Sequence, residues 1–190
     1  MYVGVMGYQG AGHLHITTLK TLGLKCCYVR SKDDFRQDLD ALIMPGGESS
    51  AQYKYCIEHD IFDEIKNFAK AGKIILGTCA GLILLSSYKS QLVNGIGLLD
   101  LEVERNCYGR QNASGVMLSD SGQQVSFIRA PGITSLGKKV RVIDTYNGSP
   151  IFVSQAIPGS AKHTIYGATF HPEIPIDSKI SNYYTELFYH

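Results

Sequence analysis

Short apolar runs alternate with longer amphipathic stretches through the first half of the chain. The apolar runs that predict strands are residues 2–6, 25–29, 39–44 and 73–76. Apolar residues at helical spacing predict helices over residues 13–22 and 61–69, and a further helix is expected at 80–87. An alternation of strands and helices indicates right-handed crossovers, and hence a parallel sheet with helices on both faces.

The second half of the chain changes to strand-like runs separated by Gly, Asn, Asp and Pro turns. These runs are residues 98–104, 116–119, 124–128, 140–146, 151–156 and 163–170. Asn147-Gly148 between two of them is typical of a hairpin turn, and residues 178–188 predict a closing helix. We therefore expect one α/β domain over residues 1–190, with a parallel core in the first half and antiparallel strands extending it.

Length and charge exclude several classes of protein. A chain of 190 residues has the size of one domain, and a net charge of +1 gives no electrostatic footprint for nucleic acid. No apolar stretch approaches the roughly 20 residues of a membrane helix, and the N-terminal residues lack the pattern of a secretory signal. We expect a soluble, cytoplasmic protein that binds neither nucleic acid nor a membrane.

The chain has five cysteines, an odd number, and no CxxC pair. This pattern argues against a disulfide framework and against a zinc ribbon, and no metal site is expected. Four of the cysteines are expected to be free thiols in or near the core, namely Cys26, Cys27, Cys56 and Cys107. Cys79 differs from them because of the residues around it.

Four turns follow predicted strands and belong at one edge of the sheet. Their residues are 7–10 (GYQG), 45–50 (PGGESS), 77–81 (GTCAG) and 171–173 (HPE). In sheets of this kind, ligands bind at the carboxyl ends of the strands. The four turns are therefore expected to surround one pocket.

Gly77 and Gly81 lie two positions before and after Cys79, which itself follows a buried strand and precedes a helix. This is the pattern of a nucleophile elbow, which exposes the nucleophile at a helix N-terminus. There, the free backbone N–H groups favour a thiolate, and the N–H of Ala80 can donate to an oxyanion. A buried cysteine in an ordinary glycine-bounded turn fits this pattern equally well.

A cysteine nucleophile needs a base, and the base needs a group that orients it. Pro172 imposes an extended backbone, so the side chains of His171 and Glu173 point the same way. Glu173 can then fix the tautomer of His171. The remaining histidines are expected to be ordinary surface residues, namely His13, His15, His59, His163 and His190.

The turn Pro45-Gly46-Gly47 is the third part of this constellation. Two glycines after a strand expose backbone N–H groups, which can hold a developing oxyanion. A plain turn has the same composition. A phosphate loop of the GxxxxGK[ST] kind is absent, which argues against nucleotide binding.

PGGES, GTCAGL and FHPE, in this order and at this spacing, resemble the triad-type glutamine amidotransferases. More narrowly, the chain resembles the glutaminase subunits of pyridoxal 5′-phosphate synthase. The motifs behind this second resemblance are GYQG at 7–10, GGES at 46–49, GTCAGLILL at 77–85, ERN at 104–106, GRQ at 109–111, IRAP at 128–131 and FHPE at 170–173. They cover nearly the whole chain.

The resemblance implies a role for each matching residue. Cys79 would be the nucleophile, His171 the base and acid, and Glu173 the group that orients His171. Gly47 and Ala80 would form the oxyanion hole through their backbones. The glutamine site would be lined by Gly47, Glu48, Ser49, Arg105, Ile128 and Arg129. Gln9 would lie near the oxyanion loop, at the contact with the synthase.

The resemblance also implies the fold and the reaction. The fold would have three layers, with an open, mostly parallel, flavodoxin-like sheet, helices on both faces and an antiparallel extension. The protein would hydrolyse L-glutamine to L-glutamate and ammonia through a cysteine thioester, with no cofactor or metal. The ammonia would pass to a pyridoxal 5′-phosphate synthase subunit, the expected partner in vitamin B6 biosynthesis.

Three other functions are compatible with parts of this pattern. The chain can be a glutaminase for another synthase, such as imidazole glycerol phosphate synthase, although the GRQ and IRAP motifs favour the vitamin pathway. A Cys-His peptidase for γ-glutamyl bonds would need a more open pocket. A catalytically silent regulatory subunit would have no use for Cys79, His171 and Glu173 together.

Overall fold

A seven-stranded sheet forms the centre of the protein. The computed structural model describes residues 1–108, 115–160, 162–174 and 181–189. The strands of this sheet follow the order β2-β1-β3-β4-β11-β10-β9, and the first five run parallel. Their bounds are β1 (Tyr2–Met6), β2 (Lys25–Val29), β3 (Ala41–Met44), β4 (Ile74–Thr78), β9 (Val140–Tyr146), β10 (Ser149–Ala156) and β11 (His163–Ala168).

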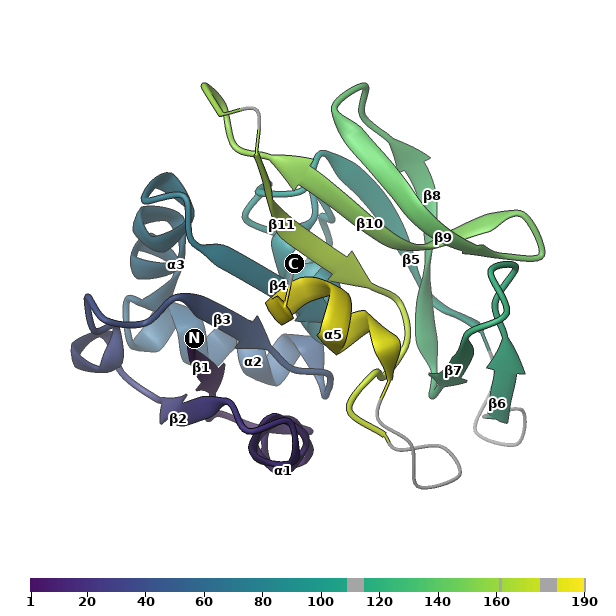
Figure 1. Cartoon of the computed structure of the whole chain (residues 1–190). Coiled ribbons are helices and arrows are strands. Elements are labelled where there is room, and N and C mark those ends of the chain that lie inside the picture. Colours follow the sequence, from purple (N-terminus) through teal and green to yellow (C-terminus); the bar gives the residue numbers. More distant parts are fainter. Residues whose placement is uncertain (109–114, 161, 175–180, 190) are drawn as a thin grey trace.

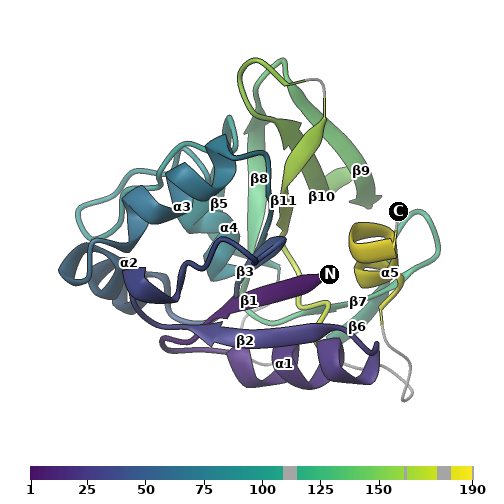
Figure 2. The same cartoon turned by 60° about the vertical axis from the view of Figure 1, so that its left-hand side comes forward.

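Helices cover both faces of this sheet (Figures 1 and 2). One apolar cluster joins it to α2 (Ser49–Glu58), α3 (Ile61–Lys70) and α4 (Ala80–Leu85). A second cluster, on the other face, joins it to α1 (Gly12–Thr21) and α5 (Asn182–Tyr189). This three-layer arrangement confirms the predicted fold class.

Strand β11 corrects the expected division into a parallel first half and an antiparallel second half. It comes from the second half, yet it pairs in parallel with β4, with Ile165 opposite Ile75 and Gly167 opposite Gly77. Among the described strands, β10 and β9 alone extend the sheet in antiparallel pairs. As a result, the residues that follow β11 lie beside those that follow β4.

Several elements lie outside the central sheet or outside the sequence prediction. The pairs β5 (Leu101–Tyr108) with β8 (Ala130–Leu136) and β6 (Gly115–Leu118) with β7 (Gln124–Phe127) are antiparallel. Helix α2, strand β8 and the short 3₁₀ helix Lys32–Asp34 were not predicted. The hairpin between β9 and β10 was predicted correctly, and both turn residues have positive φ, 50° at Asn147 and 75° at Gly148.

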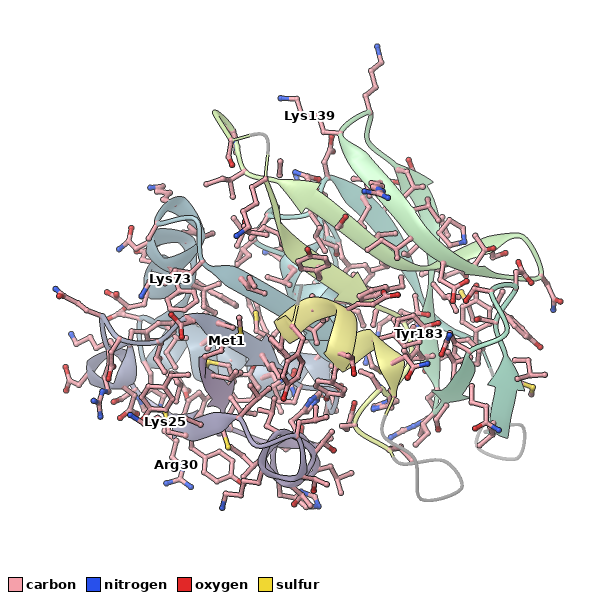
Figure 3. All side chains as sticks on the ribbon, in the orientation of Figure 1. Met1, Lys25, Arg30, Lys73, Lys139 and Tyr183 are labelled. Atoms are coloured by element: carbon pink, nitrogen blue, oxygen red, sulfur yellow. The ribbon has the colours of Figure 1, made fainter. Side chains whose placement is uncertain are left out.

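The closing helix α5 supports the end of β11. Tyr183, labelled in Figure 3, belongs to α5. Its ring lies against Phe152 and Phe170, with centroid separations of 5.0 and 4.7 Å. Phe170 directly precedes His171, so this aromatic contact anchors the loop that carries the histidine. Of the helix expected at 178–188, residues 178–180 lie outside the described residues.

Within the described ranges, no helix is long and apolar enough to cross a membrane. All five cysteines are free. Cys56 is buried, and Cys26 and Cys27 are half-buried, as expected of thiols in or near the core. Cys107 is exposed, so the prediction was wrong for that residue, which lies on β5 outside the central sheet.

Candidate active site

Cys79 occupies the turn between β4 and α4. Its backbone has φ 48° and ψ −102°, a conformation that is rare for any residue except glycine. The turn is closed tightly by glycines: a Cβ atom at Gly81 would lie 2.0 Å from the backbone oxygen of Met44. The N–H of Cys79 donates to the oxygen of Ala168 on β11 over 2.8 Å. The cysteine is thereby held at the shared end of two parallel strands.

His171 and Glu173 follow β11 and form a short hydrogen bond. The Nδ1 of His171 lies 2.7 Å from Oε1 of Glu173, and both side chains are buried. Since a carboxylate can only accept, His171 donates through Nδ1–H and its Nε2 remains for Cys79. Extended backbone around Pro172 thus places the two side chains as the sequence predicted.

The environment favours opposite charges on these two residues. Burial would lower the pKa of His171, but hydrogen bonds with Cys79 and Glu173, together with their negative charge, raise it to about 10. Burial would raise the pKa of Glu173, whereas its contact with the His15 ring and its hydrogen bond with and attraction to His171 bring it below its usual value. An imidazolium at His171 attracts a thiolate at Cys79.

The turn after β3 closes over this pair. A Cβ atom at Gly46 would lie 2.4 Å from Cε1 of His171 and 3.3 Å from Cβ of Cys79, so only glycine fits there. The N–H of Gly46 donates to Oγ1 of Thr78 over 3.0 Å. Gly47 has φ 154°, again in the region that favours glycine.

Gln9, in the turn after β1, braces the same loop. Its Oε1 accepts the N–H of Glu48 over 2.9 Å, and its backbone oxygen accepts Nε2 of Gln52 over 2.9 Å. Glu48 caps α2 by accepting the N–H of Ala51 over 2.9 Å. The turns after β1 and β3 therefore form one hydrogen-bonded unit.

A cavity of about 280 Å³ opens at this end of the sheet. It is lined by Gln9, Gly47, Glu48, Cys79, Arg105, Asn106, Ile128, Arg129 and His171. Some of these residues come from the four predicted turns. The others come from β5 and from the short link between β7 and β8. Neither Ala80, the first residue of α4, nor the buried Ser49 is among the lining residues.

Charged side chains face each other at the mouth of the cavity. The NH2 of Arg105 lies 3.0 Å from Oε1 of Glu48. Partial burial would raise the pKa of Glu48, but its bonds with Ala51, Ser50 and Arg105 bring the pKa below the usual value. The carboxylate and the guanidinium are each partly exposed, so both are available to a polar ligand.

Two lining residues have a strained backbone. Asn106 has φ 60° and Arg129 has φ 46°, both in the left-handed region. Asn106 lies within β5, where the pairing with β8 shifts between Glu104 and Tyr108, and such irregularities redirect side chains. Asn106 was not singled out from the sequence except as part of the ERN motif. The GRQ motif at 109–111 lies outside the described residues.

The sequence prediction was also wrong for His15. It was expected on the surface, but it is fully buried on α1, with Nε2 3.4 Å from Oε2 of Glu173. A single histidine in an amphipathic helix carries no sequence signal for such a contact.

The other histidines give no further correction. His13 and His59 are exposed, as predicted, while the side chains of His163 and His190 lie outside those described. The described residues contain no cluster of His, Cys, Asp or Glu suited to a metal ion.

Comparison with known proteins identifies relatives over nearly the full chain. The family model described as the SNO glutamine amidotransferase family matches residues 5–190. Proteins named pyridoxal 5′-phosphate synthase subunit PdxT are 37% identical in Thermoplasma acidophilum, with 98% of this chain and 93% of that protein aligned, and 37% identical in Francisella tularensis subsp. tularensis, with 97% and 98% aligned.

Solved structures show the same architecture. One described as a glutamine amidotransferase has a TM-score of 0.82 at 34% identity and covers 97% of each chain. PurLQS from Thermotoga maritima has a TM-score of 0.62 at 21% identity, with 93% of this chain and 89% of that chain covered, which is a likeness of fold alone.

Proposed function

The chain belongs to the SNO glutamine amidotransferase family, and from this premise we propose that it hydrolyses L-glutamine for a pyridoxal 5′-phosphate synthase. In this role it acts as a glutaminase subunit, releasing L-glutamate and supplying ammonia to a synthase partner in vitamin B6 biosynthesis. The names of its relatives support the pathway, since they are pyridoxal 5′-phosphate synthase subunits.

The placement of His171 between Glu173, which its Nδ1 contacts, and Cys79, which lines the same cavity, is the observation that carries this proposal. A nucleophile, a base and an orienting carboxylate are the three groups that amide hydrolysis through a thioester requires. Cys79 and His171 line the same cavity although they follow two separate strands, and Glu173 is buried beside His171. A silent regulatory subunit would gain nothing from this buried, mutually charged arrangement.

The cavity supports a site for the α-amino and α-carboxylate groups of glutamine. Glu48 offers a carboxylate to the ammonium group, and Arg105 and Arg129 offer guanidinium groups to the carboxylate. Ile128 provides apolar contact for the methylene groups. Gly47 contributes backbone to the cavity, whereas the side chain of Ser49 is buried at the start of α2 and does not line the cavity.

The first half of the reaction forms the thioester. The Cys79 thiolate attacks the side-chain amide carbon of glutamine, and the carbonyl oxygen becomes an oxyanion. The backbone N–H groups of Gly47 and Ala80 donate to this oxyanion. His171 then gives its proton to the amide nitrogen, the carbon–nitrogen bond breaks, and ammonia leaves.

The second half of the reaction restores the enzyme. His171, now neutral, takes a proton from water as the water attacks the thioester carbon. The carbon–sulfur bond breaks, glutamate leaves, and Cys79 returns to its thiolate opposite a protonated His171. Ammonia in bulk water would be lost to protonation, so it passes directly to the synthase. Gln9 lies in the loop proposed to contact that partner.

Glutamate release in the presence of candidate synthase subunits tests this function. We expect the purified chain to hydrolyse glutamine when mixed with a pyridoxal 5′-phosphate synthase subunit, measured by a coupled glutamate assay. The same assay with the synthase subunit of imidazole glycerol phosphate synthesis is the control. Stimulation by that control partner alone would overturn the proposed pathway, and no hydrolysis with either partner would overturn the glutaminase assignment.

Replacing Arg105 by Gln is expected to raise the KM for glutamine about 10- to 100-fold, because a charge-assisted hydrogen bond contributes roughly 1.5–3 kcal/mol. The value of kcat should change little, since the guanidinium binds ground state and transition state alike. Steady-state glutamate release with the synthase gives both constants.

Arg36→Gln is the matched control, because Arg36 precedes β3 at the opposite end of that strand and its side chain is mostly exposed. It should leave KM unchanged. A lowered kcat with an unchanged KM in Arg105→Gln would contradict the substrate-binding assignment.

A further inference from the structure

A buried histidine lies directly behind the carboxylate of the proposed triad. His15 is fully buried on α1, the helix that covers the sheet face opposite α4. Its Nε2 lies 3.4 Å from Oε2 of Glu173, the carboxylate oxygen that does not face His171. That oxygen makes no hydrogen bond with any described residue, so the contact with His15 is what offsets the loss of its hydration. Burying an uncompensated carboxylate oxygen is costly.

Two further residues contact the ring nitrogens of His15. The hydroxyl of Tyr184 on α5 forms a short hydrogen bond with Nδ1. Oγ1 of Thr78 on β4 lies 3.4 Å from Nε2. Residues from α5 and β4 therefore determine the position of this imidazole on α1, and its third contact is Glu173.

The charge of Glu173 determines where the protons lie in this cluster. An ionised carboxylate only accepts, so a favourable contact requires the proton of His15 on Nε2. Nδ1 is then an acceptor, and the hydroxyl of Tyr184 must donate to it. Burial keeps the pKa of Tyr184 well above its ordinary value, so this hydroxyl retains its proton. The donors in this cluster therefore all point one way: Tyr184 donates to His15, and the N–H of His15 faces Glu173.

His15 is neutral in this arrangement. Burial lowers its pKa, the charge of Glu173 opposes that shift, and the charge of His171 adds to it. Among the described residues, the titratable groups that face His15 are Glu173 and His171 from the loop after β11 and Tyr184 from α5. A neutral His15 leaves the negative charge of Glu173 available to His171.

We propose that His15 is a positioning residue for the reaction: it holds the Glu173 carboxylate through Oε2 and thereby fixes the imidazole of His171 opposite Cys79. The proposal rests on the proposed glutaminase function and adds to it a residue that does not reach the substrate cavity. Thr78 links the same imidazole to the turn after β3, because Oγ1 of Thr78 also accepts the N–H of Gly46.

The main test replaces His15 by Leu and by Gln in the complex with the synthase. The Leu side chain fills the space but offers no N–H, whereas Gln can present an amide N–H near the position of Nε2. We expect His15→Leu to lower kcat for glutamate release about 10- to 100-fold, the scale of groups that orient a functional residue at one remove. KM should be unchanged, because His15 does not line the cavity. His15→Gln should recover most of kcat.

The pH dependence separates positioning from simple packing. The N–H of His15 stabilises the charge of Glu173, so its loss raises the pKa of Glu173 and lets more of that charge act on His171, whose pKa also rises. Both changes move the acidic limb of the kcat–pH profile of His15→Leu to higher pH. A packing defect would lower the active fraction without moving that limb.

His13→Leu is the matched control, because it makes the same substitution on an exposed residue of the same helix. It should keep the wild-type kcat and pH profile. If His15→Leu does not fold, Tyr184→Phe decides, since it keeps the ring and removes the donor to Nδ1; it should lower kcat and shift the acidic limb in the same direction.

A wild-type kcat and pH profile in His15→Leu, or in Tyr184→Phe where the first variant does not fold, would overturn the positioning role. Equal losses in His15→Gln and His15→Leu with an unmoved acidic limb would overturn it as well. Wild-type protein that releases no glutamate with the synthase would instead refute the proposed function itself, so the two failures are distinguishable.

Discussion

Replacement of Cys79 by Ala is expected to lower glutamate release by the complex at least about 10⁴-fold, because removing the nucleophile of a hydrolytic triad eliminates the covalent route. The backbone of Cys79 lies at φ 48°, a conformation equally unfavourable for alanine, so the substitution adds little strain. Glutamate release with the synthase, together with a thermal unfolding curve, separates lost chemistry from lost fold.

Labelling provides an independent measurement of the same assignment. A glutamine-analogue electrophile such as diazo-oxo-norleucine should modify Cys79 in the wild-type protein, as read by peptide mass spectrometry, and should do so faster with the synthase present. Cys107→Ala is the control, because Cys107 is exposed and should be irrelevant to turnover. A label on Cys26, Cys56 or Cys107 in place of Cys79 would show that the nucleophile has been misassigned.

His171→Asn is expected to abolish measurable glutaminase turnover, with a loss of at least about 10³-fold, because the base for thiol and water and the acid for ammonia disappear together. Asparagine can still donate a hydrogen bond toward Glu173 but has no group at the position of Nε2. Binding to the synthase, measured by size-exclusion chromatography, should persist. His13→Asn is the matched control, an exposed histidine that should tolerate the change.

The same variant should change the pH dependence of stability. The pKa of His171 rises from about 6.5 to about 10 in the folded state, so its contribution is full below pH ~6.5 and is lost as pH rises through ~10. The lowered pKa of Glu173 makes its contribution present above pH ~4.3 and lost as pH falls further. Urea unfolding should therefore show the largest destabilisation by His171→Asn between about pH 4.3 and 6.5, declining toward pH 10. Destabilisation that grows with alkalinity, or turnover near the wild-type value, would contradict the assignment.

Local sequence was sufficient wherever a residue's conformation depends on its immediate neighbours. Gly77 and Gly81 around Cys79 predicted the tight turn because larger side chains would meet backbone atoms there. The Asn147-Gly148 pair predicted a hairpin because both positions need positive φ. Pro172 predicted the shared direction of His171 and Glu173 through its fixed backbone.

Helix α2 and strand β8 were missed because their burial does not follow an apolar pattern. Only Ser49, Gln52 and Cys56 of α2 are buried, and the amide of Gln52 is satisfied by the backbone oxygens of Gln9 and Pro45. Such a helix shows little apolar pattern, and the hydrogen bonds of Gln52 add to the apolar contacts that Cys56, Tyr53 and Tyr55 make with the core. Strand β8 begins with Ala130 and Pro131, which do not favour a strand by themselves. Its pairing with β5 makes it one.

The α/β class, the elbow at Cys79 and the pairing of His171 with Glu173 could be predicted from the sequence alone, since each follows from local patterns of neighbouring residues. The parallel pairing of β11 with β4, which brings His171 to the same cavity as Cys79 across nearly half the chain, depends on tertiary packing. Tertiary packing also decided that His15 lies behind Glu173. Contacts of this kind depend on how separate elements pack. The apolar pattern of a helix shows which face is buried, but not which residue of another element contacts that face.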